Sequence, residues 1–271
     1  MHTLLAVALE AAREATEIIL AAADQPHKVD HKGRTNLVTE TDRRAEERII
    51  TVIRDHFPQH TILAEESGKS TTSSDFTWIV DPLDGTTNFV HGYPSYAVSI
   101  GVWAQNRPQV SVVVELPFNH VYAAVRGSGA TCNDQPIHVS PMNDLSQALL
   151  VTGFGYEHNR LWHTNMELFK QLTDITQGVR RLGSAAVDLC HVASGKVDAF
   201  WELDLHPWDT AGGVLLVQEA GGLVTTMRGD PYSIFHKQIL ASNGALHDAL
   251  LSITRPKIDT LIKEKVLSNA S

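Results

Sequence analysis

Two aspartates at the end of an apolar run are the residues of this sequence best suited to chemistry. Asp81 and Asp84 lie three residues apart in the segment WIVDPLDGTTNF, residues 78–89. Because Pro82 lacks the N–H that a sheet ladder needs, we expect the strand to end at Asp81 and the chain to turn there. Two carboxylates at the end of a rigid strand can converge on one hard cation. They could also bridge two ions that clamp a phosphoryl group.

The turn after these aspartates is suited to an anion. Gly85 permits a backbone conformation that other residues avoid, and Thr86 is expected to open a short helix. N–H groups around these two residues could hold an anionic ligand. The Thr86 hydroxyl, oriented by a carboxylate, could position an attacking water. The structural alternative is a plain strand–turn–helix connection in which an aspartate caps the helix.

Three further acidic segments each admit a functional and a structural interpretation. The glutamates at 65–66 follow a short apolar run, and adjacent carboxylates repel each other unless a cation or solvent separates them. A solvated loop is the alternative there. Asp209 lies in the first turn of a helix expected to begin at Pro207, where the helix dipole alone favours a carboxylate. Thr39 and Asp42 could form a helix capping box.

The candidate ligands are all oxygen atoms, which favours a hard cation. The acidic segments contain no pair of histidines, and carboxylate sets suit Mg²⁺, Mn²⁺ or Ca²⁺ better than Zn²⁺. The two cysteines, Cys132 and Cys190, have no CxxC partner. This argues against a disulfide framework or a thiolate zinc site, and it makes a reducing cytosol (a cytoplasmic location) the expected compartment. Cys190 lies on an apolar helical stripe and is expected to be inert core.

Length and charge limit the partners. With 271 residues, the chain has the length of about two domains or one large one. Its formal net charge is −9 and it has no block of Lys and Arg, so nucleic acid and anionic membranes are poor partners. The apolar runs are far shorter than the roughly 20 residues that cross a bilayer. The first residues are expected to form a helix rather than a signal peptide.

Helical and strand-like patterns place the acidic segments on a mixed scaffold. Helices are expected at residues 4–19 and 41–57, followed by an antiparallel meander. The expected strands of the meander are 77–80, 96–104, 110–116 and 121–126, with turns at 106–108 and 117–119. In the second half, strands are expected at 148–154, 199–203, 223–227 and 239–242, and helices at 161–176, 184–194 and 207–220.

The best candidate for a domain boundary is the segment SPMN, residues 140–143. It predicts an N-terminal α+β half, residues 1–140, with most of the metal ligands. It also predicts a C-terminal α/β half, residues 141–271, with the substrate-binding residues and Asp209. Mixed elements on both sides imply layered α/β or α+β halves.

Four motifs together resemble one enzyme family. Residues 81–86 (DPLDGT) resemble the DP(I/L)DGT signature of the inositol monophosphatase family, and residues 208–212 (WDTAG) resemble its WDxAG signature. Residues 65–67 (EES) resemble the upstream acidic element, and residues 183–186 (GSAA) the GSAA segment. All occur in family order. The resemblance implies a layered αβαβα sandwich of the inositol monophosphatase and fructose-1,6-bisphosphatase type. It also implies a Mg²⁺-dependent, lithium-sensitive phosphatase that forms homodimers.

The same resemblance implies a role for individual residues. The implied metal ligands are the side chains of Glu65, Asp81, Asp84 and Asp209 and the carbonyl of Leu83. They would hold two to three Mg²⁺ ions, with Mn²⁺ as a substitute. Thr86, hydrogen-bonded to Asp42, would activate the nucleophilic water together with Glu65. The implied substrate contacts are Asp84, the backbone N–H groups of Gly85 and Thr86, the segment Gly183, Ser184 and Ala185, and Glu202.

Three functions are compatible with these motifs. The preferred one is hydrolysis of inositol monophosphate to inositol and phosphate, because the chain length and Glu202 favour a small phosphorylated polyol. A sister phosphatase would share the metal residues and act on fructose 1,6-bisphosphate, 3′-phosphoadenosine 5′-phosphate, histidinol phosphate or NADP. Arg180 and Arg181 are too few to decide between these substrates. A regulatory, transcription-associated binding protein of the same family is the third function, and the complete metal set and the absence of a basic patch argue against it.

The acidity of the chain fits a metal-dependent enzyme. Five acidic residues belong to the proposed site: Asp42, Glu65, Asp81, Asp84 and Asp209. Divalent ions bound there would invert the local field, so that a phosphate would be attracted only to the metal-loaded enzyme.

Overall fold

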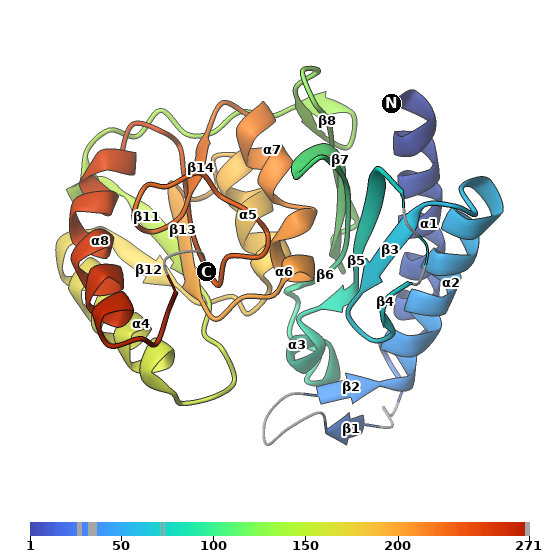
Figure 1. Ribbon diagram of the computed structural model, residues 1–271, viewed down its shortest axis with the longest axis horizontal. Coiled ribbons are helices and arrows are strands. Elements are labelled where there is room, and N and C mark those ends of the chain that lie inside the picture. The colour runs from blue at the N-terminus through green and yellow to red at the C-terminus, as the bar shows by residue number, and fades with distance from the viewer. Residues whose placement is uncertain (26–28, 32–36, 71, 73, 269–271) are drawn as a thin grey trace.

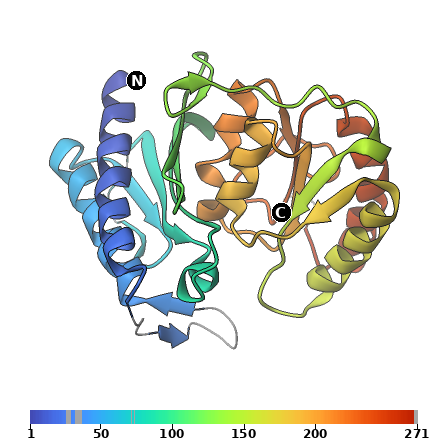
Figure 2. The same ribbon diagram turned by 180° about the vertical axis from the view of Figure 1, so that it is seen from behind.

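Two large β-sheets, separated and covered by helices, form most of the described part of the chain, and a two-stranded sheet is added by β1 (Val29–His31) and β2 (Leu37–Thr39). The computed structural model describes residues 1–25, 29–31, 37–70, 72 and 74–268. The layers run helix, sheet, helix, sheet, helix, and the views from the two sides agree on this order (Figures 1 and 2). A layered, mixed fold is what the sequence predicts.

The larger sheet has eight strands in the order β10-β9-β8-β7-β6-β5-β3-β4. Its strands are β3 (Thr61–Ala64), β4 (Gly68–Lys69), β5 (Phe76–Asp84), β6 (Tyr96–Ala104), β7 (Arg107–Leu116), β8 (His120–Val125), β9 (Ala130–Cys132) and β10 (Gln135–Pro136). The expected antiparallel meander is confirmed for β5 to β8, and β3 pairs with β5 in parallel. Parallel pairing brings the chain that leaves β3 to the same sheet edge as the end of β5.

The expectation that β5 ends at Asp81 is wrong. The strand continues to Asp84, which pairs with Ala97 of β6, while Asp81 pairs with Ser99. The register shifts between the two aspartates, and Pro82 falls in this irregularity. A β-bulge tolerates a residue without an N–H, so proline can sit inside the strand. Both aspartates are therefore held by the sheet itself.

The turn between β6 and β7 is tighter than expected. Gln105 and Asn106 adopt φ values of 52° and 56°, and Arg107 already pairs with Ala104. Two residues with positive φ give a turn whose twist matches that of the flanking strands. The expected turn at 106–108 is thus displaced toward the N-terminus.

Helices α1 (His2–Ala22) and α2 (Glu40–His56) cover the outer face of the larger sheet (Figure 1). The apolar stripe expected in residues 4–19 is buried against the sheet, from Leu4 to Ile19. Ile49 and Ile53 anchor α2 in the same core. Buried polar side chains in the first two turns of α2 contact the candidate site described below.

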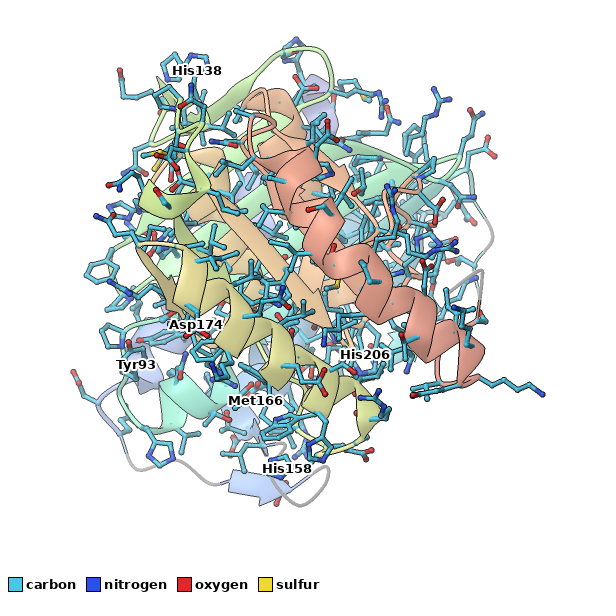
Figure 3. All side chains as sticks on the ribbon, turned by 90° about the vertical axis from the view of Figure 1, so that its left-hand side faces the viewer. Tyr93, His138, His158, Met166, Asp174 and His206 are labelled. Atoms are coloured by element: carbon cyan, nitrogen blue, oxygen red, sulfur yellow. The ribbon has the colours of Figure 1, made fainter. Side chains whose placement is uncertain are left out.

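The smaller sheet has five strands in the order β12-β11-β13-β15-β14. Its strands are β11 (Leu149–Thr152), β12 (Gly178–Arg180), β13 (Ala199–Leu203), β14 (Leu223–Thr225) and β15 (Gln238–Ser242). Helices α4 (Arg160–Ile175) and α8 (His247–Lys263) lie side by side in front of it, with His158 marking the lower end of α4 (Figure 3). The sequence analysis did not anticipate α8.

Three helices fill the layer between the sheets (Figure 1): α5 (Ala185–Ala193), α6 (Pro207–Ala211) and α7 (Val214–Glu219). The single helix expected over 207–220 is interrupted. Gly213 donates to Thr210, three residues back, so the regular ladder breaks there. A Cβ at Gly212 or Gly213 would overlap Ser99 or Leu189, so close packing demands glycine at this break. Cys190 is fully buried here, as expected for an inert core residue.

Short elements complete the described chain: β1 (Val29–His31), β2 (Leu37–Thr39), α3 (Thr86–Val90) and the 3₁₀ turn Leu145–Gln147. The chain crosses from the larger sheet to the smaller one between Pro136 and Leu149. One apolar core in the middle layer joins both sheets, so a division into residues 1–140 and 141–271 stays a prediction. None of the described helices combines the length and the apolar character needed to cross a bilayer.

Candidate active site

One cavity of about 1450 Å³ collects nearly every residue that the sequence singled out. The predicted site residues that line it are Glu65, Asp81, Leu83, Asp84, Gly85, Thr86, Gly183, Ser184, Ala185, Glu202 and Asp209. Asp42 is the exception, because it lies behind Thr86 and contacts it from α2. Segments up to 144 residues apart in sequence therefore meet at one place.

The larger sheet positions the first two acidic segments. Ala64, the last residue of β3, pairs with Val80, and the N–H of Glu65 donates to the Val80 carbonyl at 3.2 Å. Glu65 therefore leaves its strand beside Asp81. Asp81 is buried, and its Oδ1 accepts the N–H of Leu83 at 3.1 Å, which fixes its side chain across the bulge.

The turn at Gly85 requires glycine. Its φ is 91°, in the left-handed region, and a Cβ there would lie 2.9 Å from the Ser95 carbonyl oxygen. The short helix α3 begins directly afterwards, as the sequence predicts. Gly85 and Thr86, at the start of this helix, both line the cavity.

Asp42 serves a structural and a site role at once. Its Oδ2 accepts the Thr39 N–H at 2.9 Å, and the Thr39 hydroxyl accepts the Asp42 N–H, which is the capping box of α2. Its Oδ1 accepts the Thr86 hydroxyl at 2.9 Å. The two interpretations of this segment therefore do not compete, because the two carboxylate oxygens are used separately.

Asp84 joins the larger sheet to the middle layer. Its Oδ2 accepts the Ser184 hydroxyl and the Ala186 N–H, both at 2.7 Å, at the start of α5. Burial raises the pKa of Asp84 to about 6, although these two hydrogen bonds oppose the shift. The adjoining Gly183 is held in place by Asn88, whose Nδ2 donates to the Leu182 carbonyl at 2.7 Å.

Asp209 enters the cavity from the first turn of α6. Its Oδ2 accepts the N–H of His206 at 2.7 Å, and Pro207 occupies the first helical position as predicted. Burial first, and then the negative charge of Asp84, raise the pKa of Asp209 well above its usual range. The ring of His206 stacks on that of Trp208, with 5.0 Å between the ring centroids.

The acidic residues fit a divalent cation by the chemistry of their donors. Burial, followed by the charges of Glu65, Asp84 and Asp209, raises the pKa of Asp81 well above its usual range. Among the described residues, no three acidic, His or Cys side chains already close around one point. They line one cavity instead, where burial and mutual repulsion make several carboxylates costly to keep ionised. A hard cation would offset the cost of burying these charges and the repulsion between them. Water and substrate would complete its oxygen shell.

Glu202 enters from β13 on the opposite side of the cavity. Burial first, and then the charge of Asp84, raise its pKa to about 8. A Cβ on Gly153 would overlap its carboxylate, so glycine at the end of β11 leaves room for this acid. No sequence motif pointed to this role of Gly153.

The structure adds cavity residues that no motif contained. Tyr156 follows β11, and its hydroxyl lies 3.5 Å from the Thr87 hydroxyl. Arg181 and Lys237 also line the cavity. Glu46 is the fourth addition, and its position four residues after Asp42 on a helix is the signal that could have found it.

Comparison with known proteins gives a consistent result. The family model for the inositol monophosphatase family matches residues 1–259. The chain is 49% identical over 265 residues to the chloroplastic phosphatase IMPL1 of Arabidopsis thaliana, covering 95% of this chain and 71% of that protein. It is 40% identical over 270 residues to the Nus factor SuhB of Pseudomonas aeruginosa, covering 97% and 100%.

A solved structure supports the same assignment. The inositol monophosphatase of Anabaena superposes with a TM-score of 0.84 at 43% identity, covering 93% of this chain and 94% of that one. The carboxylates of the cavity point to the same family as the similarities in sequence and structure. The chain belongs to the inositol monophosphatase family and is a phosphoric monoester hydrolase.

Proposed function

We propose that this chain hydrolyses the phosphate monoester of a small polyol in a Mg²⁺-dependent reaction, with inositol monophosphate as the preferred substrate. The observation that carries the proposal is the convergence of mutually repelling carboxylates and the glycine turn at Gly85 in one cavity. Such an arrangement is costly without a cation and well suited to a phosphoryl group with one.

The metal-binding role falls to the acidic wall. Glu65, Asp81, Asp84 and Asp209, with the carbonyl of Leu83, would hold two to three Mg²⁺ ions, and Mn²⁺ would substitute for them. When bound, such ions lower the pKa of a ligand water and neutralise charge on the phosphoryl group and the leaving oxygen. The remaining work belongs to the protein's own residues.

Thr86 orients the attacking water. Its hydroxyl hydrogen points to Asp42 Oδ1 at 2.9 Å, or to the Leu83 carbonyl at 3.1 Å, so its oxygen is left as an acceptor. A water that donates to this oxygen and to Glu65 has a lone pair left for phosphorus. Backbone N–H groups of Gly85 and Thr86 donate to the phosphate oxygens. Positioning and charge neutralisation are the main contributions that phosphoryl transfer needs from a protein.

The opposite wall recognises the alcohol part of the substrate. A pKa of about 8 leaves Glu202 mostly protonated at neutral pH, so it can donate to one substrate hydroxyl and accept from another. Asp84, Ser184 and Ala185 border the same space at the start of α5. A polyol, whose hydroxyls both donate and accept, matches this wall.

Two observations support alternative roles for this chain. Arg181 and Lys237 line the cavity, and cations there would suit a substrate with a second anionic group, such as a bisphosphate or a nucleotide. The similarity to SuhB, which is named a Nus factor, extends over the whole of that protein. A regulatory contact with a transcription complex is therefore a second candidate function beside catalysis.

A phosphatase panel tests the proposal. Phosphate release is measured with and without Mg²⁺ for inositol 1-phosphate, fructose 1,6-bisphosphate, 3′-phosphoadenosine 5′-phosphate, histidinol phosphate and NADP. We expect the highest kcat/KM for inositol 1-phosphate, no turnover in EDTA, and inhibition by Li⁺. Activity that is unchanged by EDTA would overturn the metal role, and a clear preference for a bisphosphate would favour a sister enzyme.

Two further features belong to the proposal. We propose a homodimer, which sedimentation of the purified protein tests directly. We also propose a reducing, cytoplasmic setting, to which two unpaired cysteines are suited. Fractionation with an antibody tests the location.

A further inference from the structure

A carboxylate outside every motif holds the loop that carries Glu65. Glu46 lies in the second turn of α2 and is only 3% exposed. Its Oε2 accepts the N–H of Glu66 at 2.7 Å, and its Oε1 accepts the N–H of Ser67 at 2.8 Å. Both oxygens of one buried side chain are thus engaged by two consecutive backbone groups.

This contact fixes the turn between β3 and β4. Two successive N–H groups that point the same way form a natural anion-binding concavity. Glu46 fills it from inside the protein, with charge-assisted bonds that are stronger than neutral ones. On the other side of the turn, the Glu65 N–H is bonded to Val80. Glu65 is therefore held both before and after its Cα.

One face of α2 contacts the segments that carry two of the proposed reacting groups, Thr86 and Glu65. Asp42 and Glu46 are four residues apart on α2, which places them one above the other. Asp42 binds the Thr86 hydroxyl, and Glu46 binds the loop that follows Glu65. The helix is anchored by its capping box and by its buried apolar face, so it acts as a rigid spacer.

We propose that Glu46 is a positioning residue for the hydrolysis, a role that rests on the proposed function. Through its two backbone hydrogen bonds it sets where Glu65 lies relative to Thr86, and so where the attacking water and one edge of the metal site lie. It neither binds the metal nor touches the substrate. Supporting contacts of this kind are worth about 10–100-fold in metal affinity or activity.

The chain offers a matched control for this contact. Glu219, at the end of α7, accepts the N–H groups of Gly127 and Gly129, both at 2.8 Å. It makes the same kind of two-point contact to a turn, but it does not line the cavity. Glu219→Gln removes an equivalent interaction from a place where it can affect only stability.

The test compares Glu46→Gln with Glu219→Gln in the full chain. In Gln, one oxygen becomes an NH₂ group that faces an N–H, so one of the two bonds is lost. The first readout needs neither metal nor activity: hydrogen exchange of the 65–69 segment in metal-free protein. The second is Mn²⁺ affinity by electron paramagnetic resonance, and the third is kcat, KM and the half-saturating Mg²⁺ concentration for the best substrate of the panel.

For Glu46→Gln we expect faster exchange at 65–69, Mn²⁺ binding weakened about 10-fold, and kcat lowered about 10–100-fold with KM changed less than threefold. Glu219→Gln should lower only the melting temperature. Glu46→Asp keeps the charge but is one methylene short, so it should fall between wild type and Glu46→Gln, and it carries the test if the Gln variant does not fold.

A merely structural Glu46 gives a different pattern. Glu46→Gln would then resemble Glu219→Gln, with a lower melting temperature and unchanged Mn²⁺ affinity and kcat, and that result would overturn the inference. Wild-type protein without phosphatase activity would instead overturn the proposed function, and hydrogen exchange and Mn²⁺ affinity would still report on Glu46.

Discussion

Asp84 and Glu115 lie in one row of the larger sheet, yet the protein treats their charges in opposite ways. Asp84 of β5 pairs with Ala97 of β6, which pairs in turn with Glu115 of β7. Helix α5 connects the two, since Ser184 at its start donates to Asp84 and His191 near its end donates to Glu115. Two acids thus share a sheet row and a helix.

The difference is in what each acid meets. Burial alone would raise the pKa of Glu115, but hydrogen bonds from His191 at 2.9 Å and His120 at 3.0 Å hold it at about 2. Lys196 lies 3.5 Å away and adds a positive charge. Asp84 receives only neutral donors and faces other acids, so burial raises its pKa to about 6.

This difference distinguishes an acid that stabilises the fold from one that is suited to binding a ligand. Glu115 has donors from two histidines and a nearby lysine, and its lowered pKa means that its charge contributes to the stability of the fold. Asp84 has neutral donors, and the charge of Glu65 adds to the rise in its pKa; a buried acid in this state marks a place where a ligand can supply positive charge. Substitutions at these acids test this difference.

Asp84→Asn breaks the unpartnered side of the comparison. Mg²⁺-dependent turnover should fall by about 10³-fold or more, since a charged ligand and a substrate contact are lost together. The amide oxygen can still accept from Ser184 and Ala186, and one buried negative charge disappears, so thermal stability without metal should be unchanged or higher. Kinetics with calorimetry check this. Retained turnover would remove Asp84 from the site.

Glu115→Gln breaks the partnered side. Stability should fall by about 1–3 kcal/mol, because hydrogen bonds from two histidines are weakened and a lysine loses its counter-charge. The kcat of the folded protein should stay within about threefold of wild type, since this network lies outside the cavity. Urea unfolding and a Michaelis–Menten series measure the two effects. A loss of turnover larger than the loss of stability would mean that the network serves the reaction.

Glu202→Gln tests the wall opposite the metal site. The KM for a polyol substrate should rise about 10-fold, because the amide loses one acceptor for substrate hydroxyls and one lost hydrogen bond is worth about 1 kcal/mol. Mn²⁺ affinity should not change. An unaltered KM together with an unaltered substrate preference would refute the contact between Glu202 and the substrate.

The pH dependence of the free energy of unfolding distinguishes Glu202 from Glu115, because their pKa values are shifted in opposite directions. The pKa of Glu202 is raised from 4.5 to about 8, so the metal-free protein should lose stability as pH rises through that window. The pKa of Glu115 is lowered from 4.5 to about 2, so its contribution should be lost as pH falls through that lower window.

Calorimetry of the metal-free protein from pH 3 to 9 checks both directions. Glu202→Gln should flatten the dependence of stability on pH in the upper window, and Glu115→Gln should flatten it in the lower window. If Glu202→Gln leaves the slope between pH 4.5 and 8 unchanged, burial does not disfavour the charge at this position.

Local sequence patterns predicted much of the scaffold. Apolar periodicity marked α1 and α2, and the β13 bounds agree with those expected from residues 199–203. The motifs were sufficient to predict which acids meet, since the cavity brings Glu65, Asp84 and Asp209 together from distant segments. Short-range spacing and recognisable motifs carry this kind of information.

What the sequence did not predict depends on contacts between distant segments. The extension of β5 through Pro82 requires the bulge against β6, and the break between α6 and α7 requires the close approach of Ser99 and Leu189. The groups around Glu115 come from α5, from β8 and from the turn after α5, and the Glu46 contact joins α2 to a loop 20 residues away. No local pattern records such pairings.

The central claim is that the acids near Asp84 form a site for divalent metal. Its most direct measurement is anomalous scattering from crystals of the full chain soaked in Mn²⁺, read against the carboxylates of Glu65, Asp81, Asp84 and Asp209. The account predicts anomalous peaks among these four side chains and none beside Glu115. An empty acidic cavity in crystals that hold Mn²⁺ elsewhere would contradict it.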